Sequence, residues 1–168
     1  MSINTGQYGR LSPMLDALER LVKVQSPSED IHACREVVKV ASEIAESVLG
    51  TAAQIHEVQG RPVFWWGSQT PRVLILAHLD TVWPIDSFTP LWSIEGDVLR
   101  GPGVFDMKAG FIQALFALKG IEGDVALIAT TDEEIGSRAS KELIQKLSST
   151  AEAVLVLEAS LDGKVKTG

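Results

Sequence analysis

Acidic residues and one histidine follow three apolar stretches of this sequence, each with the length of a buried strand. The stretches are residues 72–77, 124–131 and 153–157, and a further acidic position lies in GPGVFDMKAG, just ahead of a segment with helical spacing. In open α/β sheets, ligands bind beyond the carboxyl ends of the strands, where loops from several strands converge. We therefore expect these side chains to gather at one edge of a single sheet. They are His78, Asp80, Asp106, Asp132, Glu133, Glu134 and Glu158.

A pocket that holds several carboxylates needs positive charge, because like charges a few ångströms apart cannot all stay ionised in a desolvated site. Lys108 is the only basic residue within these motifs. A divalent metal ion would supply the charge, and one imidazole with several carboxylates is a ligand set that suits Zn²⁺. A carboxylate can also bridge two such ions. Asp80, two residues after His78, is expected to accept the other imidazole N–H and so fix its tautomer.

The adjacent acids Glu133 and Glu134 suggest a division of roles. Neighbouring side chains diverge from an extended backbone, so the two carboxylates are not expected to point the same way. One would bind metal while the other handles protons. Metal lowers the pKa of a bound water to roughly 7, and a carboxylate that takes its proton can later deliver it to a leaving amine. This chemistry is hydrolysis of an amide or a similar bond.

Each of these residues also has a purely structural interpretation. His78 would be a core histidine hydrogen-bonded to Asp80, and Glu158 would be a solvated strand end. Asp106 and the adjacent glutamates would be acids in first helical turns, where a carboxylate meets the positive end of the helix dipole. For Lys108, a solvated helix position is the alternative to neutralising the cluster, and we assign it no role.

The elements that must position these residues can be predicted from hydrophobic periodicity. Helical spacing is expected over 12–24, 31–50, 107–119 and 136–148, and strands over 52–58, 62–66, 72–78, 124–131 and 151–160. Alternation of strands with helices after residue 72 is typical of a parallel sheet with helices packed on it. The fold class predicted is therefore α/β, with a mostly parallel central sheet flanked by helices.

Composition narrows the possible partners and location. The formal net charge of −7 argues against a nucleic-acid or anionic-membrane partner, since either would need a clustered basic surface. Neither a signal-peptide core nor a membrane-spanning apolar run is recognisable, so a cytoplasmic protein is expected. Cys34, the single cysteine, lies on an apolar helical stripe and is expected to be a buried thiol. Trp83, five residues after His78, is the tryptophan expected to line a pocket.

Four motifs, in this order and spacing, resemble those of a known family: AHLDTV, GPGVFDMKAG, TTDEEIGS and LEAS. The family is the co-catalytic zinc aminoacylase/carboxypeptidase family of metallopeptidases, which includes glutamate carboxypeptidase, succinyl-diaminopimelate desuccinylase and acetylornithine deacetylase. The resemblance extends from about residue 10 to the end of the sequence. It implies a zinc-dependent exopeptidase-like fold with two Zn²⁺ ions, for which Co²⁺ or Mn²⁺ can substitute. The implied substrate is a small peptide or an N-acyl amino acid.

The resemblance also implies a role for each site residue. His78 and Glu158 would bind one zinc, Asp106 would bridge both, and Glu134 would bind the second. Glu133 would be the general acid/base and Asp80 the orienting partner of His78. A cis peptide is implied after Asp106.

Two parts of the family pattern have no counterpart in these 168 residues. One is a further histidine that completes the second zinc site, and the other is a lid or dimerisation domain. The remaining histidines, His32 and His56, fall in a predicted helix and an early strand ahead of the site. We therefore expect residues 1–168 to be the N-terminal portion of a catalytic domain with a truncated sheet. The chain would belong to a homodimeric hydrolase and be inactive alone. The alternatives are a non-catalytic metal-binding or interaction module with the same fold and a purely structural α/β domain.

Overall fold

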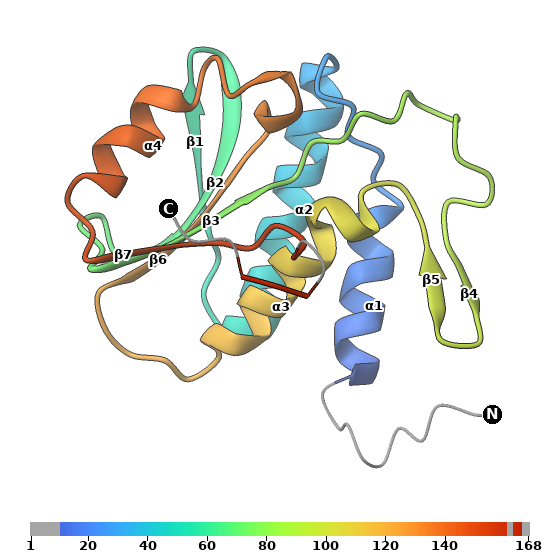
Figure 1. Cartoon of the computed structure of the whole chain (residues 1–168), viewed down its shortest axis with the longest axis horizontal. Helices are drawn as coiled ribbons and strands as arrows, with labels where there is room; N and C mark the ends of the chain where they lie inside the picture. The colour runs from blue at the N-terminus through green and yellow to red at the C-terminus, as the bar shows by residue number, and fades with distance from the viewer. Residues whose placement is uncertain (1–10, 161–162, 166–168) are drawn as a thin grey trace.

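The computed structural model describes residues 11–160 and 163–165 of the chain. Its α/β fold contains a five-stranded sheet in the order β1-β2-β6-β3-β7 and a separate β4-β5 hairpin (Figure 1). The strands are β1 (Gln54–Val58), β2 (Arg61–Gly67), β3 (Val73–His78), β4 (Ser93–Glu95), β5 (Val98–Arg100), β6 (Val125–Thr130) and β7 (Ala153–Val156). The helices are α1 (Leu11–Val22), α2 (Ile31–Leu49), α3 (Ala109–Leu118) and α4 (Lys141–Ser148), with a π-helical turn η1 (Val104–Lys108) and a 3-10 turn η2 (Glu133–Ile135).

Strands β3, β6 and β7 run parallel, and β1 and β2 extend the sheet with antiparallel pairing. Leu76 of β3 lies opposite Ile128 of β6 and Val156 of β7, while His78 lies opposite Thr130. The carboxyl ends of the parallel strands therefore reach the same edge of the sheet. The predicted fold class, with a mostly parallel central sheet flanked by helices, is confirmed.

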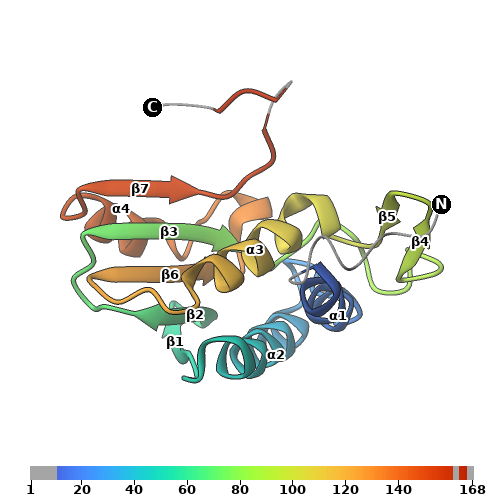
Figure 2. The same cartoon turned by 90° about the horizontal axis from the view of Figure 1, so that it is seen from below.

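Helices cover both faces of the sheet, which explains why its central strands are apolar throughout. Figure 2 shows α1, α2 and α3 on one side of the strands and α4 on the other. Along β6, Leu127 belongs to the core under the three helices, whereas Ile128 belongs to a smaller core that includes Leu147 of α4. A strand that is buried on both faces needs apolar residues at successive positions rather than at alternate ones.

Helix α2 has the clearest local signals for its ends. The Asp30 carboxylate accepts a hydrogen bond from Ala33 N at 3.0 Å, which satisfies one of the free N–H groups of the first turn. At the other end, Gly50 adopts a left-handed conformation with φ of 78°, and its N–H donates to Glu46 O. The predicted range of 31–50 is thus confirmed to within one residue.

The predicted helix over 136–148 begins five residues late, at Lys141. Gly136 and Ser137 are left-handed, with φ of 87° and 51°, and they turn the chain away from a helical path. The buried Asp132 carboxylate accepts hydrogen bonds from Ala139 N at 2.7 Å and Ser140 N at 3.1 Å, which holds this loop in place. Hydrogen bonding from the strand end therefore overrides the helical spacing in these residues.

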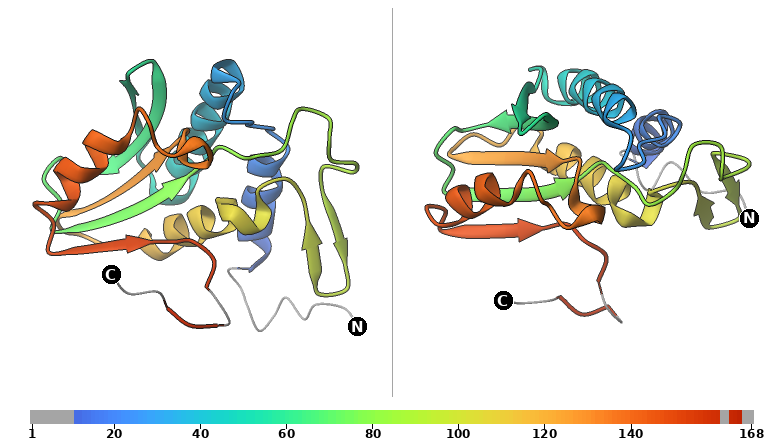
Figure 3. Two further views of the ribbon diagram at one scale, coloured as in Figure 1. Left: turned by 45° about the horizontal axis from the view of Figure 1, so that its top comes forward. Right: turned by 90° about the horizontal axis from the view of Figure 1, so that it is seen from above.

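The chain also contains an unpredicted hairpin, and its last described strand is an edge strand. Strands β4 and β5 pair with each other, apart from the main sheet. Figure 3 shows β7 at the border of the sheet, and Val156 on it is 58% exposed. Among the described residues, no helix is both long and apolar enough to cross a membrane. Cys34 is fully buried, as its position on the helical stripe predicted.

Candidate metal centre

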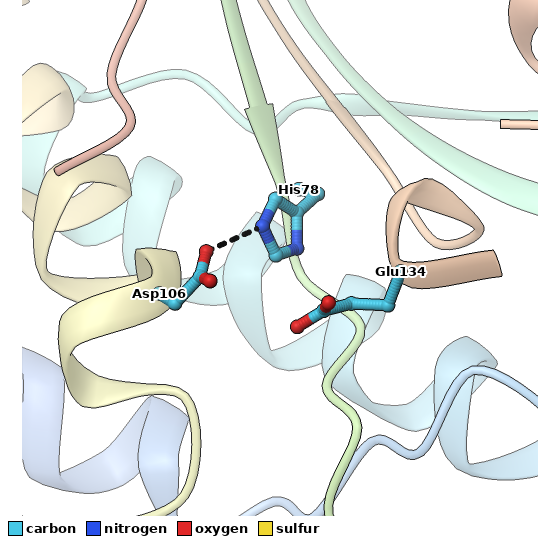
Figure 4. Close-up of side chains that lie close together, drawn as sticks. All are labelled: His78, Asp106 and Glu134. Carbon is cyan, nitrogen blue, oxygen red and sulfur yellow. Dashed lines mark hydrogen bonds and ion pairs between the residues drawn. The ribbon is translucent and has the colours of Figure 1, made fainter. Parts of the chain in front are cut away.

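His78 stands at the centre of the candidate site as the last residue of β3. Its side chain is buried, with 1% exposed, and Asp106 and Glu134 approach it from η1 and η2 (Figure 4). The imidazole Nδ1 lies 3.1 Å from the backbone oxygen of Asp80 and 3.4 Å from its Oδ1. With Nδ1 directed at Asp80, Nε2 is the nitrogen available to a metal ion.

Three carboxylates surround Nε2 of His78. Asp106 Oδ1 lies 3.0 Å away, Glu158 Oε1 3.3 Å away, and Glu133 Oε2 4.0 Å away. Their side chains are 55%, 31% and 50% exposed respectively, so the cluster opens to solvent on the side opposite β3. Side chains from three separate loops thus converge on one ring nitrogen.

Two sets of three residues bring their potential ligand atoms within 4.8 Å of one another. One set is His78, Asp106 and Glu134, and the other is His78, Glu133 and Glu158. An imidazole nitrogen with carboxylate oxygens is the donor chemistry that Zn²⁺ accepts. The residues present therefore fit a zinc ion, and the two sets share His78.

Asp80 ties the strand end to the η2 turn. Its fully buried carboxylate accepts hydrogen bonds from Glu133 N at 3.3 Å and Glu134 N at 3.1 Å. It also accepts one from Ser28 Oγ at 2.7 Å. Asp80 thus contacts the His78 imidazole and at the same time holds the backbone N–H groups of both adjacent glutamates.

Without a metal ion, the charged groups of the cluster shift one another's pKa values. Burial lowers the pKa of His78, but the hydrogen bond and charge of Asp80, followed by Asp106 and Glu158, raise it from 6.5 to about 9. Burial raises the pKa of Asp80, yet the hydrogen bonds from His78 and Ser28 outweigh it and lower that pKa. Burial and the charge of Asp106 raise the pKa of Glu134. The same two effects raise the pKa of Glu158, although the charge of His78 opposes them. A divalent cation would relieve this crowding of carboxylates.

Glu133 and Glu134 are the first two residues of the short η2 turn. The expectation that they diverge was based on an extended backbone, whereas the structure places both in a 3-10 turn. Their carboxylates nevertheless fall into different potential ligand sets around His78. Gly136 N donates to Glu133 O at 2.8 Å and Ser137 N donates to Asp132 O at 2.7 Å, which closes the turn.

Asp106 is held by an irregular turn ahead of α3. The peptide bond between Asp106 and Met107 is cis, as the family resemblance implied. Gly103 begins this turn with φ of 70°, and a Cβ atom there would lie 2.6 Å from Cγ2 of Thr81. Lys108 N donates to Gly103 O at 2.9 Å. The turn therefore packs closely on the loop that follows β3, and this packing brings Asp106 to His78.

Two residues beside the site had no functional role in the sequence prediction. The solvated position considered for Lys108 is wrong, because its side chain is completely buried and donates to backbone carbonyls at the end of α1. Burial lowers its pKa to about 7. Ser28, the donor to Asp80, was missed because nothing in the local sequence signals a contact with a residue 52 positions away.

The remaining aromatic and histidine predictions agree with the structure. Trp83 lines a cavity of about 470 Å³ that Asp106 and Glu134 also line, so it does face the candidate site. His56 lies on β1 and stacks on Trp65, with 5.0 Å between the ring centroids. His32 is exposed on α2. Neither of these histidines belongs to a potential ligand set among the described residues.

Comparison with known proteins gives matches of sequence and fold. Carboxypeptidase G2 of Pseudomonas sp. strain RS-16 is 35% identical over 104 residues, which cover 56% of this chain and 25% of that protein. The M20 family metallo-carboxypeptidase Sso-CP2 of Sulfolobus solfataricus has a TM-score of 0.69 at 27% identity, covering 88% of this chain and 38% of that one. Human carnosine dipeptidase 1 shares the fold, with a TM-score of 0.68 at 22% identity over 89% of this chain and 39% of that one.

The chain thus spans between a quarter and two fifths of the length of these three proteins. Residues 74–167, more than half of the chain, match the peptidase family M20/M25/M40. This stretch contains His78, Asp106, the η2 turn and Glu158, so the match covers the residues of the candidate centre. The chain belongs to the peptidase family M20/M25/M40.

Proposed function

We propose that this chain supplies the metal-binding part of the active site of a zinc-dependent hydrolase that cleaves amide bonds. In this proposal His78 and Glu158 would hold one ion, Glu134 would hold the second, and Asp106 would contribute to both. The observation that carries this assignment is the approach of Asp106 Oδ1 and Glu158 Oε1 to His78 Nε2, at 3.0 and 3.3 Å. Co²⁺ or Mn²⁺ can replace zinc in such a set of nitrogen and oxygen ligands.

Glu133 acts as the general base and acid in this proposal. Zinc, when bound, supplies Lewis acidity and lowers the pKa of water to roughly 7. The Glu133 carboxylate is half-exposed and reaches within 4.0 Å of His78 Nε2, beside the proposed metal position. It takes a proton from the attacking water and returns it to the leaving amine. Asp80 keeps His78 in the tautomer that presents Nε2 and holds the η2 backbone through two N–H donors.

The second ion has fewer ligands than the first in this proposal. Zinc normally takes four ligands in tetrahedral geometry. Of the described residues, Asp106 and Glu134 are the two that we assign to the second ion. We therefore infer that this 168-residue chain binds one ion tightly and the second weakly, and that it hydrolyses little or nothing alone. It would act as the N-terminal portion of the catalytic domain of a homodimeric enzyme.

The proposed substrate is a small peptide or an N-acyl amino acid. The names of two similar proteins support the peptide, since one is a carboxypeptidase and the other a metallo-carboxypeptidase. The cavity beside Asp106 and Glu134, with Trp83 in its wall, offers room for part of such a substrate.

The test measures hydrolysis by the protein in the form in which its host produces it. Zinc-loaded protein is incubated with dipeptides and N-acyl amino acids, and released amine is measured. We expect Glu133→Gln to lower kcat by at least about 100-fold with zinc content unchanged, because a general base contributes about 10²–10⁴-fold. Glu36→Gln, at an exposed position on α2, is the matched control and should retain full activity. If the zinc-loaded wild-type protein from its host, as distinct from residues 1–168 alone, hydrolysed none of these substrates, the non-catalytic metal-binding module would be favoured instead.

A further inference from the structure

The connection between α1 and α2 carries none of the proposed ligands, yet it pairs with the loop that follows His78. Thr81 N donates to Ser26 O at 2.8 Å, and Ser28 N donates to Thr81 O at 3.2 Å. Ser26 Oγ donates to Leu79 O at 2.6 Å. These three hydrogen bonds hold residues 79–81 against the connection, directly after the strand end that presents the imidazole.

Ser28 extends this contact to the other acidic loop. Its buried hydroxyl donates to Asp80 Oδ2 at 2.7 Å, and Asp80 in turn accepts from the backbone of the η2 turn. Arg61 of β2 donates both to Ser28 O and, at 3.2 Å, to Thr131 O just after β6. The loops after β3 and β6 are therefore joined to each other through the same short connection.

Lys108 joins the third loop to this connection. It lies two residues after Asp106, and its fully buried amino group donates to Val24 O at 3.0 Å and to Leu21 O at 3.4 Å. These carbonyls lie at the end of α1, where the negative end of the helix dipole favours a cation. Burial of a lysine amino group is costly, and the hydrogen bonds to the Leu21 and Val24 carbonyls offset part of that cost. The same hydrogen bonds join the η1 turn to the end of α1.

We propose that residues 24–28 form a positioning element for the metal centre, with two positioning residues: Ser28 within the segment and Lys108, which donates to its Val24 carbonyl. Lys108 fixes the turn that carries Asp106, whereas Ser28 fixes Asp80 and, through it, His78. Neither side chain belongs to a potential ligand set among the described residues. The inference rests on the proposed metal site, and loss of such supporting partners typically weakens metal binding about 10- to 100-fold.

The test compares Lys108→Met and Ser28→Ala with matched controls in this chain. Lys23→Met replaces an exposed lysine at the same end of α1, and Ser47→Ala replaces an exposed serine of α2. Hydrogen exchange of the metal-free proteins is followed by mass spectrometry, zinc affinity by competition with a chelator, and the unfolding midpoint by urea.

We expect Lys108→Met to speed exchange in residues 101–108 and Ser28→Ala to speed it in residues 79–81 and 133–134. Each should weaken zinc binding about tenfold or more without a matching loss in the unfolding midpoint, and both controls should behave as wild type. Unchanged local exchange, or wild-type zinc affinity despite faster exchange, would overturn the proposal. If the variants showed faster local exchange but the wild-type chain bound no zinc, the proposed function would fail, while the role of Ser28 and Lys108 in positioning the loops would stand.

Discussion

Zinc binding at this site should depend steeply on pH, because His78 must lose a proton before it can bind metal. Its pKa of about 9 means that, at pH 7, only about one imidazole in a hundred is neutral. The deprotonation costs about 3 kcal/mol at that pH, so zinc affinity at pH 7 should be about 100-fold below its high-pH limit. Affinity should rise about tenfold for each pH unit between 6 and 8.

His78 should contribute to the stability of the metal-free chain with the opposite trend. A raised pKa stabilises the folded state fully below the unfolded value of 6.5, and this contribution is lost as pH rises through about 9. The loss is roughly 3 kcal/mol for this buried group. The His78 contribution to apo stability therefore falls with pH over the range in which zinc affinity increases, whereas the lowered pKa of Lys108 contributes in the opposite direction above about pH 7.

Chelator competition between pH 6 and 8 measures the affinity, and calorimetry in buffers of different ionisation enthalpy counts the released protons. We expect about one proton from His78 for the first ion. Asp80→Asn removes the largest charge that raises the pKa, so its affinity should vary less with pH in this range. Equal zinc affinity at pH 6 and pH 8, with no proton released, would show that the imidazole is not a ligand.

Three further outcomes can be checked on the same chain. Asp80→Ala removes the charge beside the buried His78 imidazole and leaves the Ser28 hydroxyl and two backbone N–H groups without their carboxylate acceptor, so it should cost about 3–5 kcal/mol by urea unfolding; a loss below about 1 kcal/mol would contradict its role. Gly103→Ala should lower both the unfolding midpoint and zinc affinity, because its Cβ atom would lie 2.6 Å from Thr81 Cγ2; a variant as stable as wild type would show that the turn can relax. The Cys34 thiol, whose pKa burial and Asp80 raise to about 11, should react with a disulfide reagent at pH 8 only as fast as the protein unfolds, which absorbance follows.

Local sequence signals predicted the strands of the parallel sheet and the residues at their ends. Strands β3 and β6 are largely buried, and β7 pairs with β3. Each of the three corresponds to an apolar run of the sequence, so hydrophobicity alone locates them. Parallel strands of one sheet then bring His78 and Glu158 to a common edge by geometry. The motifs in between added Asp106 and the adjacent glutamates.

Contacts between distant segments account for what the sequence did not predict. Ser28 reaches Asp80 across 52 positions, and Lys108 reaches Val24 across 84. No periodicity or spacing in the sequence predicts either contact. The misplaced start of α4 has a more local origin, because hydrogen bonds to the Asp132 carboxylate, from residues seven and eight positions later, decide the path of residues 136–140.

The most direct measurement is diffraction from crystals of this chain grown or soaked with zinc, with data collected on both sides of the zinc absorption edge. We expect an anomalous peak about 2.0–2.2 Å from His78 Nε2 and from oxygens of Asp106 and Glu158. A weaker second peak is expected beside Glu134. Crystals of His78→Ala under the same conditions should lack the first peak. A zinc-loaded wild-type crystal with no anomalous density within bonding distance of these residues would contradict the assignment of the metal centre.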